Sequence, residues 1–184
     1  MTDVQTQLLV DGENIDATLG NAILGGRPQP DQRPRWDRVR EYVADHWARP
    51  VNPLFFINAS SGSLPMAFVQ ALMAMEYRVV PLSGEPGEKV VDMAIISTLQ
   101  ALRGRPDDVL LASHDGDFAD DLLPLVGEDR RVGVLGFPEY VSQLLREDER
   151  IEVLDIEHDA RAFTVALPRL RIIPIGEFDP AAFL

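Results

Sequence analysis

The sequence predicts an α/β domain built on a doubly wound, mainly parallel sheet of five to six strands with helices on both faces. Two observations lead to this fold class. Short, nearly continuous apolar runs alternate with segments of helical periodicity, as in parallel strands that are buried on both faces. Right-handed crossovers between such strands then place helices on the two faces of the sheet. The chain of 184 residues also suits one domain with a sizeable core.

The strands are expected where four or five apolar residues follow one another. Each run is too short for a buried helix and is bounded by polar or turn-forming residues. The expected strands are residues 7–10, 54–57, 77–80, 109–112, 131–135 and, as a sixth, 151–154.

The helices are expected where apolar residues recur every three or four positions. In residues 88–102, for example, Val91, Ile95, Leu99 and Leu102 share one face. The expected helices are residues 35–47, 64–75, 88–102, 118–126 and 139–145.

We expect the α/β domain to span residues 1–158 and a C-terminal extension to span residues 159–184. The extension contains two apolar segments, FTVAL and LRIIPI. These segments are expected either to add edge strands to the sheet or to form an arm through which the chain makes a homo-oligomer.

Composition narrows the class of protein. The absence of cysteine excludes a disulfide scaffold and a zinc–thiolate site, and it fits a reducing compartment. The first residues lack the pattern of a signal peptide, and no apolar run is long enough to span a bilayer. We therefore expect a cytoplasmic protein that does not associate with membranes.

The charge balance opposes bulk binding to nucleic acid. The formal net charge is −13, whereas proteins that bind nucleic acid contact phosphate through lysine and arginine. An arginine-rich stretch, residues 27–40, is the candidate path for a polyanion. The alternative is a solvated loop and helix face whose arginines pair with Asp31, Asp37 and Glu41. Lys89 is the only lysine among 17 basic residues.

Acidic residues follow the first and fourth predicted strands directly. Asp11 and Asn14 stand in the sequence DGEN, and Ser113, Asp115 and Asp117 stand in SHDGDF. In a doubly wound sheet the carboxyl ends of these two strands flank the point where the winding reverses, and ligands bind there. For both motifs the alternative is structural, since aspartate favours turns and caps helix N-termini.

The third motif lies at the start of the predicted helix 88–102. Lys89 and Asp92 are three residues apart and share one side of the helix. Asp92 borders the apolar face, so it needs a partner, although an acid near a helix N-terminus is also favoured by the dipole. Carboxylates that converge from three elements repel one another unless a cation such as Mg²⁺ or Mn²⁺ binds between them.

The three motifs together resemble the NYN domain family, a branch of the PIN-like metal-dependent ribonucleases. The family pattern has Asp-x-x-Asn after the first strand, Lys-x-x-Asp in a mid-chain helix, Ser-Gly-Asp-x-Asp-Phe after the fourth strand and a later Ser-x-x-Leu. The matching positions are Asp11 and Asn14, Lys89 and Asp92, Ser113, Asp115, Asp117 and Phe118, and Ser142 and Leu145. Residues 1–158 are thus expected to form a PIN-like nuclease domain.

The chain departs from the family pattern at two places. His114 stands where the family has glycine, so it is expected to change the loop or to contact substrate. The acid that follows the last motif is displaced, with Asp148 and Glu149 as candidates.

The resemblance implies RNA as substrate, in single-stranded or structured form, with Mg²⁺ or Mn²⁺ as cofactor. It makes Asp11, Asp92, Asp115 and Asp117 the metal ligands and catalytic residues, with Asn14, Lys89, Ser113 and Ser142 binding substrate.

Two other functions compete with RNA cleavage. A catalytically weak PIN-like domain would bind metal, RNA or a protein without turnover. A phosphohydrolase of the haloacid-dehalogenase type would need a second aspartate where Glu13 stands.

Overall fold

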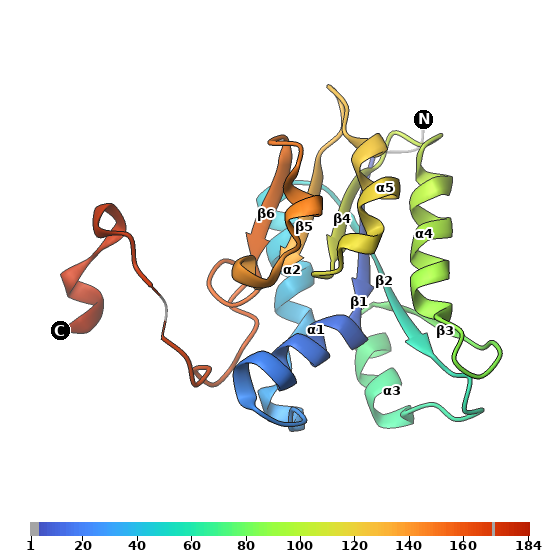
Figure 1. The fold of residues 1–184 in the computed structure, drawn as a ribbon, viewed down its shortest axis with the longest axis horizontal. Coiled ribbons are helices and arrows are strands. Elements are labelled where there is room, and N and C mark those ends of the chain that lie inside the picture. Colours follow the sequence, from blue (N-terminus) through green and yellow to red (C-terminus); the bar gives the residue numbers. More distant parts are fainter. Residues whose placement is uncertain (1–3, 171) are drawn as a thin grey trace.

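The computed structural model describes residues 4–170 and 172–184, and in it all six predicted strands join one sheet (Figure 1). Every pairing is parallel, and the strand order is β3-β2-β1-β4-β5-β6. The winding therefore reverses between β1 and β4, as the sequence predicts. The strands are β1 (Thr6–Asp11), β2 (Val51–Asn58), β3 (Arg78–Leu82), β4 (Asp108–Ala112), β5 (Val132–Gly136) and β6 (Ile151–Asp155).

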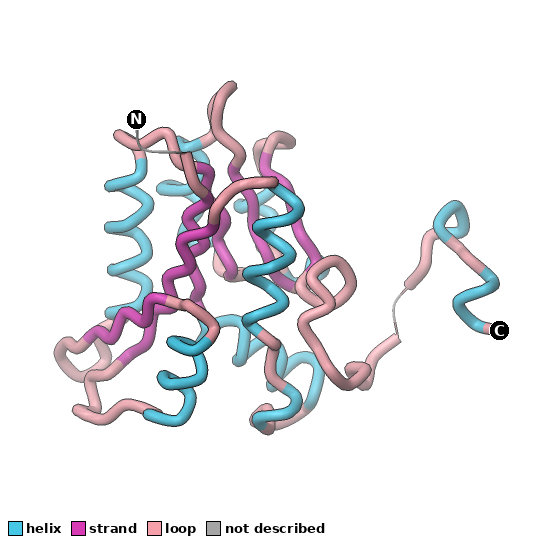
Figure 2. The backbone as a smooth tube through the Cα atoms, turned by 180° about the vertical axis from the view of Figure 1, so that it is seen from behind, coloured by secondary structure: helices cyan, strands magenta, loops and turns pink. Residues whose placement is uncertain are grey.

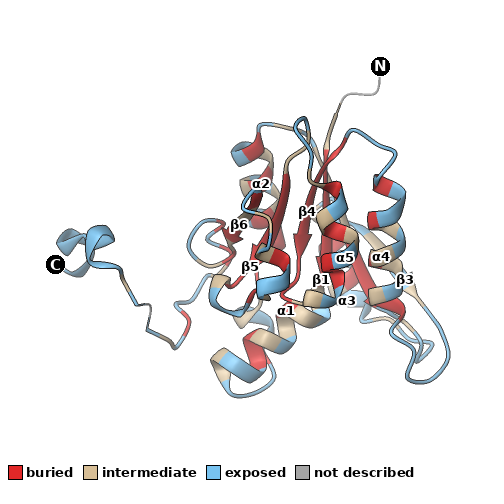
Figure 3. Cartoon of the chain, turned by 45° about the horizontal axis from the view of Figure 1, so that its top comes forward, coloured by how far each residue is buried: buried red, intermediate tan, exposed pale blue. Residues whose placement is uncertain are grey.

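Helices cover both faces of this sheet, which Figures 1 and 2 show from opposite sides. The helices α1 (Gly12–Thr18), α2 (Trp36–Trp47) and α3 (Met66–Ala74) pack on one face, and α4 (Val90–Leu102) and α5 (Ala119–Leu122) pack on the other. Leu8 and Val10 belong to the first core and Leu9 belongs to the second; all three are completely buried. The central strands β1, β4 and β5 are buried at every position because helices cover both faces, as the colours of Figure 3 show.

The helix predicted at residues 139–145 is wrong. The connection between β5 and β6 contains two short 3-10 turns, Pro138–Tyr140 and Gln143–Arg146. Val141 and Ser142 lie between them with ψ angles of 125° and 139°, which are extended values that interrupt any helix.

Two other helical segments differ from the expectation. The helix predicted at residues 118–126 is α-helical only in α5, and it ends in a 3-10 turn that holds Pro124, which has no N–H to donate. The sequence interpretation missed α1, which continues into a π-helical turn at Leu19–Leu24. The sequence pattern that could have predicted α1 is the pair Ile15 and Leu19, which are four residues apart and both fully buried.

The C-terminal extension forms no strand in residues 159–170 or 172–184, so the expectation of edge strands is wrong. Its carbonyl groups bond elsewhere: the Arg35 N–H donates to the Ala162 carbonyl, and the Arg38 guanidinium donates to the carbonyls of Arg161 and Phe163. Residues 172–184 lie away from the domain (Figure 1). Among the described residues, no helix has both the length and the apolar character needed to cross a membrane.

Candidate metal centre

The site begins where β1 and β4 end side by side. Val10 pairs with Ala112, so the next residues, Asp11 and Ser113, leave the sheet together. The Ser113 hydroxyl donates to Oδ2 of Asp11 at 2.9 Å, and the Asn14 N–H donates to Oδ1 at 3.3 Å. The Asp11 carboxylate is thus held through both oxygens, and it also caps α1.

Asp11 lies in a poorly solvated position, with only 4% of its surface exposed. Burial raises the pKa of its carboxyl to about 6, although the hydrogen bonds from Ser113 and Asn14 lower it. The negative charges of Asp92 and Glu13 raise it further. Because both donors to Asp11 are neutral groups, a cation would stabilise its ionised form.

The other three aspartates come to the same edge of the sheet from α4 and from the turn after β4. Lys89 connects them: its Nζ lies 3.4 Å from Oδ2 of Asp92 and 3.8 Å from Oδ2 of Asp117. The hydrogen bond to Asp92, together with the charges of Asp92, Asp117 and Asp115, raises the pKa of Lys89. Residues from three separate motifs therefore interact in one place.

These side chains do not form a ready-made metal cage. Among the residues that the structure describes, no three acidic or imidazole side chains are gathered closely enough to hold an ion. The Lys89 ammonium lies between Asp92 and Asp117, and Asp115 Oδ1 accepts the Asp117 N–H at 2.9 Å as a cap. The donor set consists of carboxylate oxygens, which suits Mg²⁺ or Mn²⁺, and the buried Asp11 has no cationic hydrogen-bond donor within the described chain.

His114 supports the site by holding the Asn14 side chain in place, a role that the sequence did not reveal. Its Nε2 accepts the Phe137 N–H at 2.9 Å, so the ring proton is assigned to Nδ1, which donates to Asn14 Oδ1 at 2.9 Å. The backbone N–H of His114 donates to the same oxygen at 2.9 Å. Burial lowers the pKa of His114 to about 4, so the ring is neutral near pH 7.

A glycine makes room for this imidazole. A Cβ on Gly136 would lie 2.6 Å from Nε2 of His114, which is closer than real contacts allow. His114 also stacks on Phe137, with ring centroids 5.8 Å apart and an interplanar angle of 12°. The space beside Gly136 and the stacking on Phe137 therefore allow a histidine at position 114, where the family has glycine.

Ser142 lies against the turn that carries Asp115 and Asp117. A Cβ on Gly116 would come within 2.5 Å of the Ser142 hydroxyl. That hydroxyl accepts the Leu144 N–H at 3.3 Å and caps the second turn before β6.

Asp148, a candidate for the acid that follows the last family motif, does not belong to the candidate metal centre. Its carboxylate binds Arg150 through both oxygens, at 2.9 and 2.7 Å, and these bonds lower its pKa to about 2. Asp148 and Glu149 also precede β6, so they lie at the amino ends of the parallel strands. The candidate centre is at the opposite edge, which makes the assignment of either residue to it wrong.

The arginine-rich stretch, residues 27–40, is largely engaged in ion pairs within the domain. One of these pairs was expected from the sequence and the others involve acids on α1 and after α3. The pairs are Arg35–Asp37, Arg33–Asp16 and Arg40–Glu76. Burial raises the pKa of the Asp16 carboxyl, and the charges of Arg33 and of the exposed Arg27 only partly oppose this effect.

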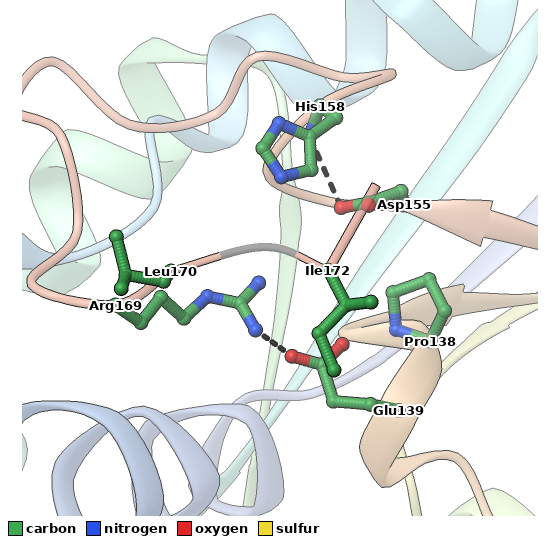
Figure 4. A pocket seen from close by; sticks show the side chains of 7 residues that line it. All are labelled: Pro138, Glu139, Asp155, His158, Arg169, Leu170 and Ile172. Atoms are coloured by element: carbon green, nitrogen blue, oxygen red, sulfur yellow. Dashed lines mark hydrogen bonds and ion pairs between the residues drawn. The ribbon is translucent and has the colours of Figure 1, made fainter. Parts of the chain in front are cut away.

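A cavity of about 370 Å³ lies where the C-terminal extension meets the loops after β5 and β6 (Figure 4). Arg169 from the extension pairs with Glu139, and the His158 N–H donates to Asp155 at 3.1 Å. None of the predicted site residues lines this cavity, so it is separate from the candidate metal centre.

Comparisons with known proteins agree with the fold. Over 86% of its length, this chain superposes on 98% of the crystal structure of a protein of unknown function from Vibrio parahaemolyticus RIMD 2210633, with a TM-score of 0.64 and 20% sequence identity. Among curated proteins the search finds no significant match. The model of the NYN domain matches residues 5–157, and the chain belongs to this family.

Proposed function

We propose that the protein is a metal-dependent ribonuclease that hydrolyses RNA phosphodiester bonds. One observation supports this most strongly: the buried Asp11 carboxylate, whose pKa is raised, faces the charge of Asp92 and is bonded only by neutral donors among the described residues. Membership of the NYN family, with its PIN-like nuclease fold, supports the same assignment.

The four aspartates and the other polar residues have different roles in the proposed site. Asp11, Asp92, Asp115 and Asp117 would hold Mg²⁺ or Mn²⁺. A bound cation of this kind supplies a water of lowered pKa and neutralises charge on the reacting phosphate. In hydrolysis this water would lose a proton to solvent and add to phosphorus, while the bond to the leaving oxygen would break and that oxygen would take up a proton.

The remaining residues bind and orient. Ser113 fixes the Asp11 carboxylate through its 2.9 Å hydrogen bond. Lys89 would exchange its pairing with Asp92 and Asp117 for a nonbridging phosphate oxygen. Asn14 would donate its amide N–H to the phosphate, and Ser142 supports the Asp115–Asp117 turn.

The partners follow from the same model. RNA would approach through a local basic path, since the net charge of −13 repels a polyanion elsewhere. The absence of cysteine fits the reducing cytoplasm. We also propose that the extension after residue 170 joins copies of the chain, because Leu170, Ile172 and Ile175 are each at least 89% exposed.

A cleavage assay on single-stranded RNA tests the proposal. Mn²⁺ or Mg²⁺ is expected to support turnover, and EDTA to stop it. Asp115→Asn is expected to abolish turnover, whereas Asp120→Asn, which removes an exposed carboxylate of α5, serves as the matched control. Cleavage that survives Asp115→Asn would come from a contaminant and would contradict the proposal.

A second candidate function is binding without turnover. It is favoured by the Lys89 ammonium between Asp92 and Asp117, which already neutralises carboxylates that a metal would need. Under this model RNA binds equally well to the wild type and to Asp115→Asn, and no cleavage occurs with any divalent metal.

A further inference from the structure

A cavity of about 250 Å³ opens next to α1, on the side of β2 and α3. We call it the α1–α3 cavity. Its lining comes from three parts of the chain that are distant in sequence. The lining includes Glu13 and Asp16 of α1, Arg27 and Arg33 of the following loop, Phe55 of β2 and Phe68 of α3.

The cavity adjoins the candidate metal centre through one residue. Gly12 follows Asp11 directly and lines the cavity. A Cβ at Gly12 would lie 2.5 Å from the Phe55 ring, so this aromatic ring packs against the backbone next to the buried carboxylate. The Glu13 carboxylate, which lines the cavity, raises the pKa of Asp11, so the cavity lies near Asp11. It is on the face of the sheet that α1–α3 cover, whereas Lys89 and Asp92 reach the centre from the opposite face.

One side of the cavity is aromatic. The Phe55 and Phe68 rings meet edge to face, with centroids 5.4 Å apart. Trp36 completes this wall and meets Phe55 with centroids 5.2 Å apart at 83°. Phe55 and Trp36 are each only 3% exposed, so the partly buried Phe68 offers the aromatic surface that is open to the cavity.

The other side offers both hydrogen-bond acceptors and donors. Asp16 Oδ2 lies 3.1 Å from Nε of Arg33, and the two side chains keep 33% and 27% of their surface exposed. Glu13 and Arg27 add a second carboxylate and a second guanidinium. The two carboxylates and the two guanidiniums balance in charge, so this lining suits a neutral, flat ligand with donors and acceptors along its edges.

We propose that the α1–α3 cavity binds a nucleobase of the RNA strand, and that guanine is the base it accepts best. Unstacked bases of single-stranded RNA bind by stacking on aromatic side chains and by hydrogen bonds along their edges. Guanine presents paired N–H donors that a carboxylate such as Asp16 accepts, and paired acceptors, O6 and N7, that an arginine fork contacts. This inference rests on the proposed function, for which it supplies a base preference beside the cleaved bond.

Calorimetric titration in EDTA tests the cavity without any metal. Guanosine 5′-monophosphate is expected to bind about tenfold more tightly than ribose 5-phosphate, which has no base. Asp16→Asn and Phe68→Leu are expected to weaken binding of guanosine monophosphate about tenfold. Asp37→Asn is the matched control, since Asp37 also pairs with an arginine but does not line the cavity.

Three results would overturn the assignment. The first is ribose 5-phosphate that binds as tightly as guanosine monophosphate. The second is binding like the wild type by both Asp16→Asn and Phe68→Leu, in variants that thermal unfolding shows to be folded. Tighter binding of adenosine, cytidine or uridine monophosphate would remove the assignment to guanine.

The two proposals can fail separately. Asp115→Asn is expected to keep full affinity for guanosine monophosphate, because Asp115 lies outside the cavity. Nucleotide binding without RNA cleavage would leave the cavity assigned and refute the nuclease. Cleavage of RNA without binding of guanosine monophosphate would support the nuclease and refute the assignment of the cavity.

Discussion

Nδ1 of His114 lies 2.9 Å from Oδ1 of Asn14, and this contact joins the loop after β4 to the helix after β1. The same oxygen accepts the backbone N–H of His114 at 2.9 Å. A carbonyl oxygen has two lone pairs, so both are used. The group that Asn14 can still offer to a ligand is its amide NH₂, which donates and cannot bind a metal.

Asn14→Ala is therefore expected to lower kcat/KM for RNA by about tenfold to a hundredfold through the loss of a donor to the phosphate. The affinity for Mn²⁺ should stay within about twofold of the wild type, because no metal ligand is lost. Cleavage kinetics and an Mn²⁺ titration measure the two effects. A variant with a large loss of metal affinity would show that Asn14 is a ligand after all.

His114 is expected to make folding stability depend on pH. Its pKa is about 4 in the folded protein and 6.5 in the unfolded chain, since burial disfavours the charged ring. Its contribution to stability is thus complete above pH 6.5 and is lost as the pH falls toward 4, by about 3 kcal/mol.

Urea unfolding of the wild type and of His114→Gln at several pH values isolates this effect. The difference in unfolding free energy between the two proteins should shrink as the pH falls from 7 to 4. A difference that stays constant across this range would show that the ring does not titrate as expected. Other titrating groups are shared by both proteins and cancel in the comparison.

Asp11→Asn is expected to stabilise the metal-free protein while it abolishes cleavage. Burial raises the carboxyl pKa from 3.8 to about 6, so the contribution of Asp11 to stability is complete below pH 3.8 and is lost as the pH rises through 6. At pH 7.5 the ionised carboxylate costs the fold about 3 kcal/mol, which the amide does not.

Thermal unfolding with and without Mn²⁺ checks this prediction. Without metal, Asp11→Asn should unfold at a higher temperature than the wild type at pH 7.5 and at a similar temperature at pH 4. Mn²⁺ should raise the unfolding temperature of the wild type only. A variant that is less stable than the wild type at pH 7.5 would refute the idea that Asp11 is strained by desolvation.

The fold could be predicted because its strands are buried on both faces. Leu8, Leu9 and Val10 are all fully buried, and such runs have no other common explanation. The position of the site followed, since parallel strands bring Asp11 and Ser113 to one edge. α1 was missed because its first residues, DGEN, also suit a turn, and only Ile15 and Leu19 indicate a helix.

The details of the site depend on contacts that no local pattern contains. His114 bonds to Asn14, 100 residues earlier, and to the backbone of Phe137, 23 residues later. The space for its ring exists only because Gly136 lies beside it. The Lys89 contact with Asp117 likewise depends on how α4 packs, so the sequence could place both residues at the site but could not pair them.

Removal of residues 170–184 is expected to leave the domain as stable as before and to dissociate any homo-oligomer. This segment is exposed at Leu170, Ile172 and Ile175, and none of its described residues belongs to either core. The unfolding free energy should change by less than about 0.5 kcal/mol. Sedimentation that gives the same mass for the full and shortened chains would exclude the extension as the oligomerisation arm.

Lys89→Gln separates the nuclease from a domain that only binds. The Lys89 ammonium competes with metal for Asp92 and Asp117, at 3.4 and 3.8 Å, so its removal should tighten Mn²⁺ binding severalfold. Turnover should nevertheless fall by about tenfold or more, because a cation that faces the reacting phosphate is lost. Stability should hardly change, since the side chain is 69% exposed. Arg103→Gln, which breaks the ion pair between Arg103, directly after α4, and Asp121 of α5, is the matched control. Tighter metal binding with undiminished cleavage would show that Lys89 only balances the charge of the neighbouring carboxylates.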